Sequence, residues 1–319
     1  MGEYRTVDFE ELMNGGELVL NTPKEEIKDI LRRIDWETES ENFPQLVFLF
    51  VELMKCFPMP RTEFTTGHFV RARRNRFKEG KLEIFNQKTE VSFNRTPSGW
   101  GRFNSDAETV FYCSCPISDD PSATASFTAN LEVCKEIIDH DDDTAEFNMT
   151  ISMWEIRKPI ILVPLVYHDA AEANSPFFRR SNEYSRNVIL RSMNPESAEL
   201  FGGFLRYLSE KAAHRKPSRK DYMVTTAFYH ALRVVYNDDV SLLYSSVQTG
   251  HRGTCVVMPN HLVEKGHVEL SQVIMYQMKK DNRTKVIDGQ PISDYIHVGS
   301  DGSFEIELFD DFKYLLKKQ

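Results

Sequence analysis

The sequence lacks any run of about eighteen apolar residues, which is the length that a membrane-spanning helix requires. Its first residues, MGEYRTVDFEEL, are acidic and include no apolar segment of the kind found in secretory signals. We therefore expect a protein of the cytoplasm that has no membrane partner.

Cysteine and positive charge are both scarce. The five cysteines are an odd number and have no CxxC spacing, so we expect free thiols in a reducing compartment rather than disulfides. Lys and Arg number 39 against 48 Asp and Glu, which gives a formal charge of −9. Nucleic-acid binding depends on neutralising phosphates with a positive surface, so we do not expect a nucleic-acid partner.

Several familiar catalytic and binding motifs are also absent. The chain contains no GxSxG, no GxGxxG and no Walker loop. The acidic stretch that follows His140, Asp141 to Asp143, lacks the glycine and the terminal glutamate of a calcium-binding loop. We expect an ordinary acidic loop there and no metal site in the protein.

The pattern of apolar residues predicts a mixture of helices and strands. Residues 1–60 are typical of helices, and Pro58 and Pro60 end the apolar segment 45–57, because proline cannot extend a helix. Further helices are predicted at 125–138, 195–213 and 221–236, and residues 169–186 are predicted to be a polar surface loop. Strands are predicted at 68–73, 109–114, 147–156, 159–167, 241–246, 253–258 and 268–278.

The order of these elements predicts an α+β fold, because helices and strands do not alternate regularly. The change from helical to strand-like patterns occurs near residue 62. We therefore expect a helical extension over residues 1–62 and a mixed-sheet domain with flanking helices over residues 63–319.

Two segments rich in glycine or arginine are candidates for ligand binding. The stretch Ser98 to Asn104 is glycine-rich and precedes a strand, so its N–H groups can approach a phosphate closely. Arg71 and Arg73 alternate along a strand and should share a face, where two guanidinium groups can bind a pyrophosphate. An ordinary turn and a solvated basic edge are the alternatives.

These segments occur in the order of known family motifs. Phe69-Val70-Arg71 is followed by Gly101-Arg102-Phe103-Asn104, by Val110-Phe111-Tyr112 and by a helix that carries Leu131-Glu132-Val133. Later come Tyr222-Met223-Val224-Thr225 and Leu243-Tyr244-Ser245-Ser246. In this wording and order, residues 67–260 resemble the RES-domain family, named for its Arg, Glu and Ser.

The resemblance implies an ADP-ribosyltransferase-like fold and an enzyme that degrades NAD⁺, as an NAD⁺ phosphorylase or glycohydrolase. NAD⁺ would be the substrate, with inorganic phosphate as a candidate co-substrate and no metal. Members of the family are often toxins paired with an antitoxin protein, which would be the partner here. The sequence leaves open whether the chain also binds a second copy of itself.

The resemblance also implies roles for individual residues. Arg71 would hold the pyrophosphate or an incoming phosphate, with Arg73 or Arg102 as helpers. Glu132 would stabilise the developing charge on the ribose. Tyr112 would stack on nicotinamide, and the Ser246 hydroxyl would contact ribose or phosphate. Asn104 would orient the glycine-rich loop, and it belongs with Gly101 and Tyr244 to the expected NAD-binding residues.

The sequence departs from the family pattern at two places. Val240-Ser241 stands where the family often has Asp-Gly, and SDDPSATAS lengthens the spacing between Tyr112 and Glu132. The insertion leaves Glu136 as the alternative functional carboxylate. Two other functions stay open: a transferase that ADP-ribosylates a protein, and a non-catalytic module that binds a nucleotide or another anion through Arg71 to Arg76.

Overall fold

The computed structural model describes residues 4–5, 23–56, 59–93, 99–106, 108–117, 124–139, 144–281 and 283–317. The predicted acidic loop at 140–143 and the start of the glycine-rich stretch at Ser98 lie outside these residues. Within the described residues, no helix is both long and apolar enough to cross a membrane.

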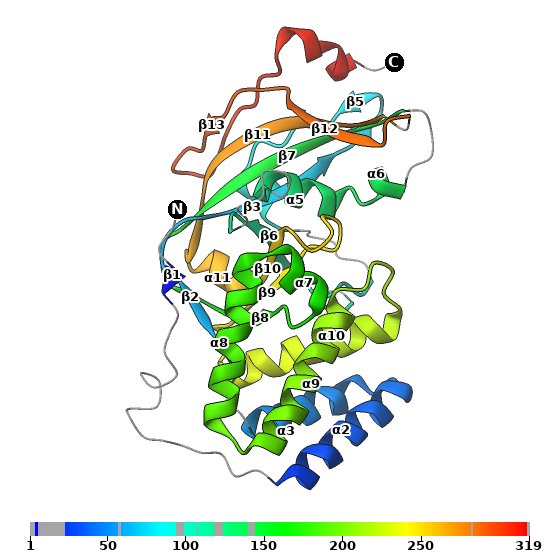
Figure 1. Cartoon of the computed structure of the whole chain (residues 1–319). Helices are drawn as coiled ribbons and strands as arrows, with labels where there is room; N and C mark the ends of the chain where they lie inside the picture. The colour runs from blue at the N-terminus through cyan, green and yellow to red at the C-terminus, as the bar shows by residue number, and fades with distance from the viewer. Residues whose placement is uncertain are drawn as a thin grey trace.

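One large mixed sheet runs through the molecule, and the helices pack beside it (Figure 1). Its strand order is β1-β2-β8-β9-β10-β6-β3-β7-β11-β12, with β13 paired to β11, and among these pairs only β8 with β9 is parallel. The strands of this sheet are β1 (Tyr4–Arg5), β2 (Thr62–Phe64), β3 (His68–Asn75), β6 (Val110–Cys115), β7 (Thr144–Ile156), β8 (Ile160–Leu165), β9 (Ser241–Ser245), β10 (Thr254–Pro259), β11 (Val268–Asp281), β12 (Val286–Pro291) and β13 (Ile296–His297).

Helices gather mainly beside the β8–β9–β10 part of the sheet, in the lower half of Figure 1. A short hairpin, β4 (Phe77–Lys78) and β5 (Lys81–Leu82), is separate from the large sheet. The helices are α2 (Lys24–Glu39), α3 (Phe43–Lys55), α4 (Lys88–Ser92), α5 (Ala125–Val133), α6 (Glu136–Asp139), α7 (Asp169–Asn174), α8 (Pro176–Ser192), α9 (Pro195–Ala212), α10 (Arg219–Val235), α11 (Asn260–Glu264) and the 3-10 helix η2 (Asp310–Lys317).

The predicted α+β class is confirmed, and so is the type of most elements. The predicted strands at 68–73, 109–114 and 241–246 correspond to β3, β6 and β9, and the predicted helices at 195–213 and 221–236 correspond to α9 and α10. Residues 144–156 and 268–281 form the long antiparallel pair β7 and β11, next to the edge strand β12. Finer likeness to an ADP-ribosyltransferase stays a prediction.

The prediction of a surface loop at 169–186 is wrong, because this segment forms α7 and α8. Ser175 caps α8, its side chain accepting a hydrogen bond from the Phe178 N–H, and Pro176 takes the first helical position. The buried face of α8 includes the polar residues Asn182 and Ser185. Because polar side chains occupy part of this face, the helical spacing of its apolar residues is masked in the sequence.

The single helix predicted at 125–138 is also wrong, because it is two helices, α5 and α6, separated at Cys134. Cys134 leaves helical geometry with φ −110° and ψ 45°. Leu131, Cys134 and Ile137 are nevertheless all buried in one apolar cluster, against which Phe127 and Ile138 pack while partly exposed.

Helices α2 and α3 pack against the body of the molecule rather than away from it. Their buried residues, among them Ile34 and Phe50, belong to one apolar cluster with residues of α9, α10, β8, β9 and β10. Phe50 lies against the rings of Phe204 and Phe228, at centroid distances of 5.8 and 5.7 Å. The boundary at residue 62 stays a prediction about the sequence pattern, since the core is continuous across it.

Candidate functional site

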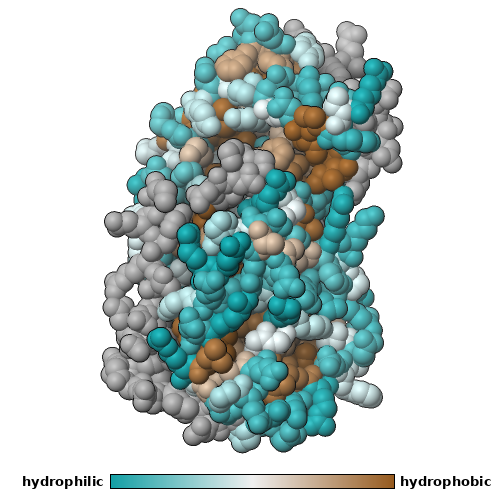
Figure 2. Space-filling view, viewed as in Figure 1, coloured by the Kyte–Doolittle hydropathy of each residue, from teal (hydrophilic) through white to brown (hydrophobic). Residues whose placement is uncertain are grey.

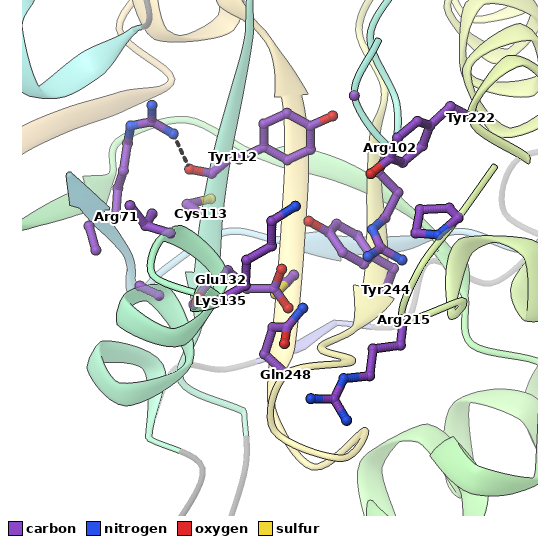
Figure 3. Close-up of a pocket in the computed structure, with 17 residues that line it drawn as sticks. Arg71, Arg102, Tyr112, Cys113, Glu132, Lys135, Arg215, Tyr222, Tyr244 and Gln248 are labelled. Atoms are coloured by element: carbon purple, nitrogen blue, oxygen red, sulfur yellow. Dashed lines mark hydrogen bonds between the residues drawn. The ribbon is translucent and has the colours of Figure 1, made fainter. Parts of the chain in front are cut away.

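A cavity of about 310 Å³ lies between the sheet, α5 and the loop that leads into α10. That volume is near the lower end of the range for small-molecule sites. Figure 3 shows its lining, to which β3, β6, β9, β10, α5 and α10 all contribute. Of the residues singled out in the sequence, those that line it are Arg71, Gly101, Arg102, Tyr112, Glu132 and Tyr244.

Arg71 reaches the cavity wall, but its guanidinium group is already engaged. Nε donates to the carbonyl oxygen of Val91 at 3.1 Å and Nη1 donates to that of Tyr112 at 2.5 Å. In Figure 3 the group points away from Glu132 and Arg102. Burial lowers the pKa of Arg71 to about 10, since a charged group is penalised where water is excluded.

Arg73 shares a face of β3 with Arg71, as the alternation predicted, but it does not line the cavity. Its guanidinium donates to the carbonyl oxygens of Glu90 and, at 2.9 Å, Phe93. Together the two arginines bind the backbone at the end of α4, where a helix leaves carbonyl groups without partners. Both therefore hold that segment against β3.

The glycine-rich loop is closed by its own hydrogen bonds. The Gly101 N–H donates to the Asn104 carbonyl oxygen at 2.9 Å, and the Tyr112 hydroxyl donates to Asn104 Oδ1 at 2.9 Å while accepting from the Phe103 N–H. A Cβ at residue 101 would lie 2.0 Å from Asn104 Oδ1, so only glycine fits there. Asn104 is thus the residue that shapes the loop. The Tyr112 hydroxyl is held by this loop, and Tyr112 also lines the cavity.

Arg102 lies at the tip of this loop and extends into the cavity. Thr225 on α10 donates a hydrogen bond to the Arg102 carbonyl oxygen, which fixes the backbone. The guanidinium lies over the Tyr244 ring at 6.0 Å, and the buried Nη1 has no hydrogen-bond partner among the described residues. A buried donor without a partner is costly, so this atom is the strongest sign of a missing anionic ligand.

Glu132 supplies the carboxylate of the cavity. It projects from α5, and its Oε1 accepts a hydrogen bond from Ser246 Oγ at 2.6 Å. Ser246 itself is fully buried behind Glu132 and accepts from the Thr249 N–H at 3.3 Å, which leaves its hydroxyl proton for the carboxylate. The structure therefore brings Glu132 and Ser246 together, with Ser246 orienting the carboxylate rather than lining the cavity.

Glu136, the alternative carboxylate, is exposed at the start of α6 and does not line the cavity. The break in the helix at Cys134 separates it from Glu132. The geometry thus favours Glu132 over Glu136 as the carboxylate of this site.

Tyr222, the first residue of one of the matched motifs, also lines the cavity, as do three residues that were not singled out from the sequence: Lys135, Arg215 and Gln248. Arg215 belongs to the basic loop before α10, which the Asp221 carboxylate anchors through Ser218, Lys211 and His214. With Arg102 and Lys135, Arg215 makes the lining of the cavity strongly positive, and among the described lining residues Glu132 is the only carboxylate. The sequence signal was weak, because a basic loop is usually solvated.

The segment after β9 carries Gln248 and is tied to the sheet by a chain of polar contacts. Ser245 Oγ lies 3.0 Å from His168 Nε2 and 3.0 Å from His251 Nδ1. His168 Nδ1 accepts from the Ala171 N–H, so Nε2 carries the proton that is donated to Ser245. Burial lowers the pKa of His168 to about 4, and the pKa of His251 is lowered by burial and then by Arg102.

A search of the described residues finds no group of three or more His, Cys, Asp or Glu side chains that could hold a metal ion. Compared with models of known protein families and with curated proteins, the sequence matches none of them. The resemblance to the RES domain therefore depends on the motifs themselves and on where their residues lie.

Proposed function

We propose that the protein cleaves NAD⁺ at the bond between nicotinamide and its ribose, in the cavity lined by Arg102, Tyr112, Glu132 and Tyr244. One observation carries the proposal: a carboxylate oriented by a buried serine shares a cavity with a buried arginine Nη1 that has no partner. A glycosyl centre attached to a diphosphate requires those two groups together.

The chemistry needs little from the protein beyond charge and position. When the C–N bond breaks, its electron pair leaves with nicotinamide, which becomes neutral and needs no protonation. The ribose carbon becomes positively charged in the transition state, and Glu132 stabilises it electrostatically. Water or inorganic phosphate then forms a new C–O bond at that carbon. An attacking water molecule loses a proton to the solvent, whereas an unprotonated phosphate oxygen has no proton to lose.

The remaining residues bind and orient the substrate. Arg102 holds the diphosphate through its guanidinium group, with Lys135 and Arg215 adding positive charge. The rings of Tyr112 and Tyr244 offer faces for the nicotinamide and the ribose. Arg71 keeps β3, α4 and β6 in place, so its contribution is to the shape of the wall rather than to the diphosphate.

We assign this activity to the cytoplasm. The five cysteines are free and buried, which suits a reducing compartment. An enzyme that consumes NAD⁺ there requires restraint, and a partner protein that covers the cavity, as the antitoxins of the family it resembles do, would provide it.

The test is the release of nicotinamide from NAD⁺ by the purified protein, measured with and without inorganic phosphate. We expect release by the wild type and a loss of about 10²- to 10³-fold in kcat for Glu132→Gln, because the transition-state charge loses its counter-charge. Arg102→Gln should mainly raise KM, since the diphosphate is equally charged in substrate and transition state.

Glu136→Gln is the matched control, because it removes a carboxylate four residues away that does not line the cavity. Its kcat should equal that of the wild type. A wild-type protein that releases no nicotinamide overturns the proposal. Release that requires a protein acceptor, with label transferred to that protein, identifies a transferase instead.

A further inference from the structure

A second cavity, of about 280 Å³, lies between α8 and the outer strands β2 and β8. Its lining includes Arg61 and Thr62 before and in β2, Pro164 in β8, and a face of α8. No lining residue is shared with the first cavity. Leu165 pairs with Tyr244, which lines the first cavity, whereas Pro164 lines the second. Because successive residues of a strand point to opposite faces of the sheet, Leu165 and Pro164 lie on opposite faces.

Two arginines give this second cavity its charge. Arg61 and Arg180 line it, and none of its lining residues is acidic. The Arg61 guanidinium lies over the Tyr236 ring, with 4.9 Å between its Cζ and the ring centroid. In this stacked contact the planar guanidinium uses its face, so the N–H groups at the edge of the guanidinium can bind a ligand. Two guanidinium groups beside one cavity without a carboxylate attract an anion.

A buried hydroxyl pair lies at the α8 side of this cavity. Ser185 lines it and is 1% exposed, and the Tyr167 hydroxyl is beside it. The two hydroxyls interact with each other, although their contact does not reach ordinary hydrogen-bond geometry. Because a hydroxyl has one donor and two acceptor sites, Ser185 can still make a further hydrogen bond to a polar ligand in the cavity.

We propose that this cavity, lined by Arg61, Arg180 and Ser185, binds a phosphate monoester of the size of a sugar phosphate or a mononucleotide. The two arginines bind the phosphate and Ser185 donates to one of its oxygens. Phe177 and Tyr184, which line the same cavity, supply rings against which the organic part packs. The site is separate from the NAD⁺ cavity and does not depend on the function proposed for it.

Isothermal titration calorimetry of the full chain tests the proposal, with inorganic phosphate, ribose 5-phosphate and AMP as separate probes. We expect saturable binding of at least one ester, tighter than that of inorganic phosphate. Arg180→Gln and Arg61→Gln should each weaken it by about tenfold or more, because each removes a charge-assisted contact. Ser185→Ala should weaken binding by a smaller factor than either arginine variant, because it removes a single neutral hydrogen bond.

Two control variants make the result specific. Arg191→Gln removes the same charge from the exposed end of α8, outside the cavity, and should leave the affinity unchanged. Arg102→Gln alters the NAD⁺ cavity and should also leave it unchanged. The proposal is overturned if no probe binds up to about 10 mM, if Arg61→Gln and Arg180→Gln bind as the wild type does, or if Arg102→Gln alone abolishes binding.

Discussion

Two arginines near the same cavity have different surroundings, and the difference decides what each can do. Arg71 donates to two backbone carbonyl oxygens and is buried, whereas Arg102 keeps a buried nitrogen that has no partner in the described part of the chain. An arginine whose donors are satisfied by the backbone stabilises the fold. An arginine with an unsatisfied donor beside a cavity destabilises the unliganded protein slightly, and it gains a hydrogen bond when a ligand binds.

Replacing Arg71 with methionine should therefore reduce stability. The carbonyl groups of Val91 and Tyr112 would lose their donors, and we expect a fall of about 2–4 kcal/mol in the free energy of unfolding. Urea denaturation at pH 7 measures it. Arg102→Met is the comparison: it should change that free energy by less than about 1 kcal/mol while raising the KM for NAD⁺ in the nicotinamide-release assay. Equal losses of stability in the two variants would contradict this division.

Arg71 and Arg102 also show how much of the candidate site the sequence could predict. The order of motifs was enough to select residues that the fold brings to one cavity, from Gly101 to Tyr244. The sequence could not say which donors are already engaged, because the partners of Arg71 are backbone atoms 20 and 41 residues away. It also could not place Ser246 behind Glu132, since that contact joins α5 to a segment 114 residues later.

At the scale of elements, sequence patterns were sufficient where apolar spacing was clear and failed where a buried face was polar. The long strands and α9 and α10 carry regular apolar patterns, and they were predicted. Helix α8 buries Asn182, whose side chain donates to the Val166 carbonyl oxygen at 2.8 Å. A polar residue that is buried because of a distant partner looks like a surface residue in the sequence alone.

His168 connects helix α7 to strand β9, because it caps the N-terminus of α7 and contacts Ser245 at the end of β9. In the folded state its pKa is about 4, whereas in the unfolded chain it should be near 6.5. Below pH 6.5 the unfolded chain binds a proton that the folded protein does not bind. Stability should therefore fall as the pH falls from about 6.5 to about 4, by at most about 1.4 kcal/mol per pH unit from this group.

Urea denaturation at pH 7 and at pH 4.5 measures this acid sensitivity. His168→Gln keeps a donor and an acceptor but removes the titration, so the difference in stability between the two pH values should shrink. His297→Gln, at an exposed position on β13, should retain the full difference. If His168→Gln is as acid-sensitive as the wild type, His168 does not control this response. His251, whose pKa is also lowered, would then be the group to replace, since its contribution has the same sign.

At the scale of the whole molecule, the walls of the first cavity, at the candidate functional site, are part of the main apolar core. The cluster that contains Phe50 of α3 also contains Tyr244 and Cys255, which line the cavity. The space-filling view in Figure 2 shows that apolar surface also remains in the lower, helical half of the molecule. The N-terminal helices and the sheet therefore share one packing arrangement, although the sequence pattern changes between them.

This continuity predicts that the chain unfolds as one unit. Phe50 is fully buried, so Phe50→Ala should lower the free energy of unfolding by about 3–5 kcal/mol, and nicotinamide release should be lost at the same denaturant concentration as the secondary structure. Phe48 lies two residues away on the same helix and is 50% exposed, so Phe48→Ala should cost less than about 1 kcal/mol.

Were residues 1–62 an independent extension, Phe50→Ala would instead produce a separate early transition that leaves activity intact. Because Phe50 packs on Phe228 of α10, and α10 also holds the Arg102 loop through Thr225, we expect the cavity to fail together with the helices.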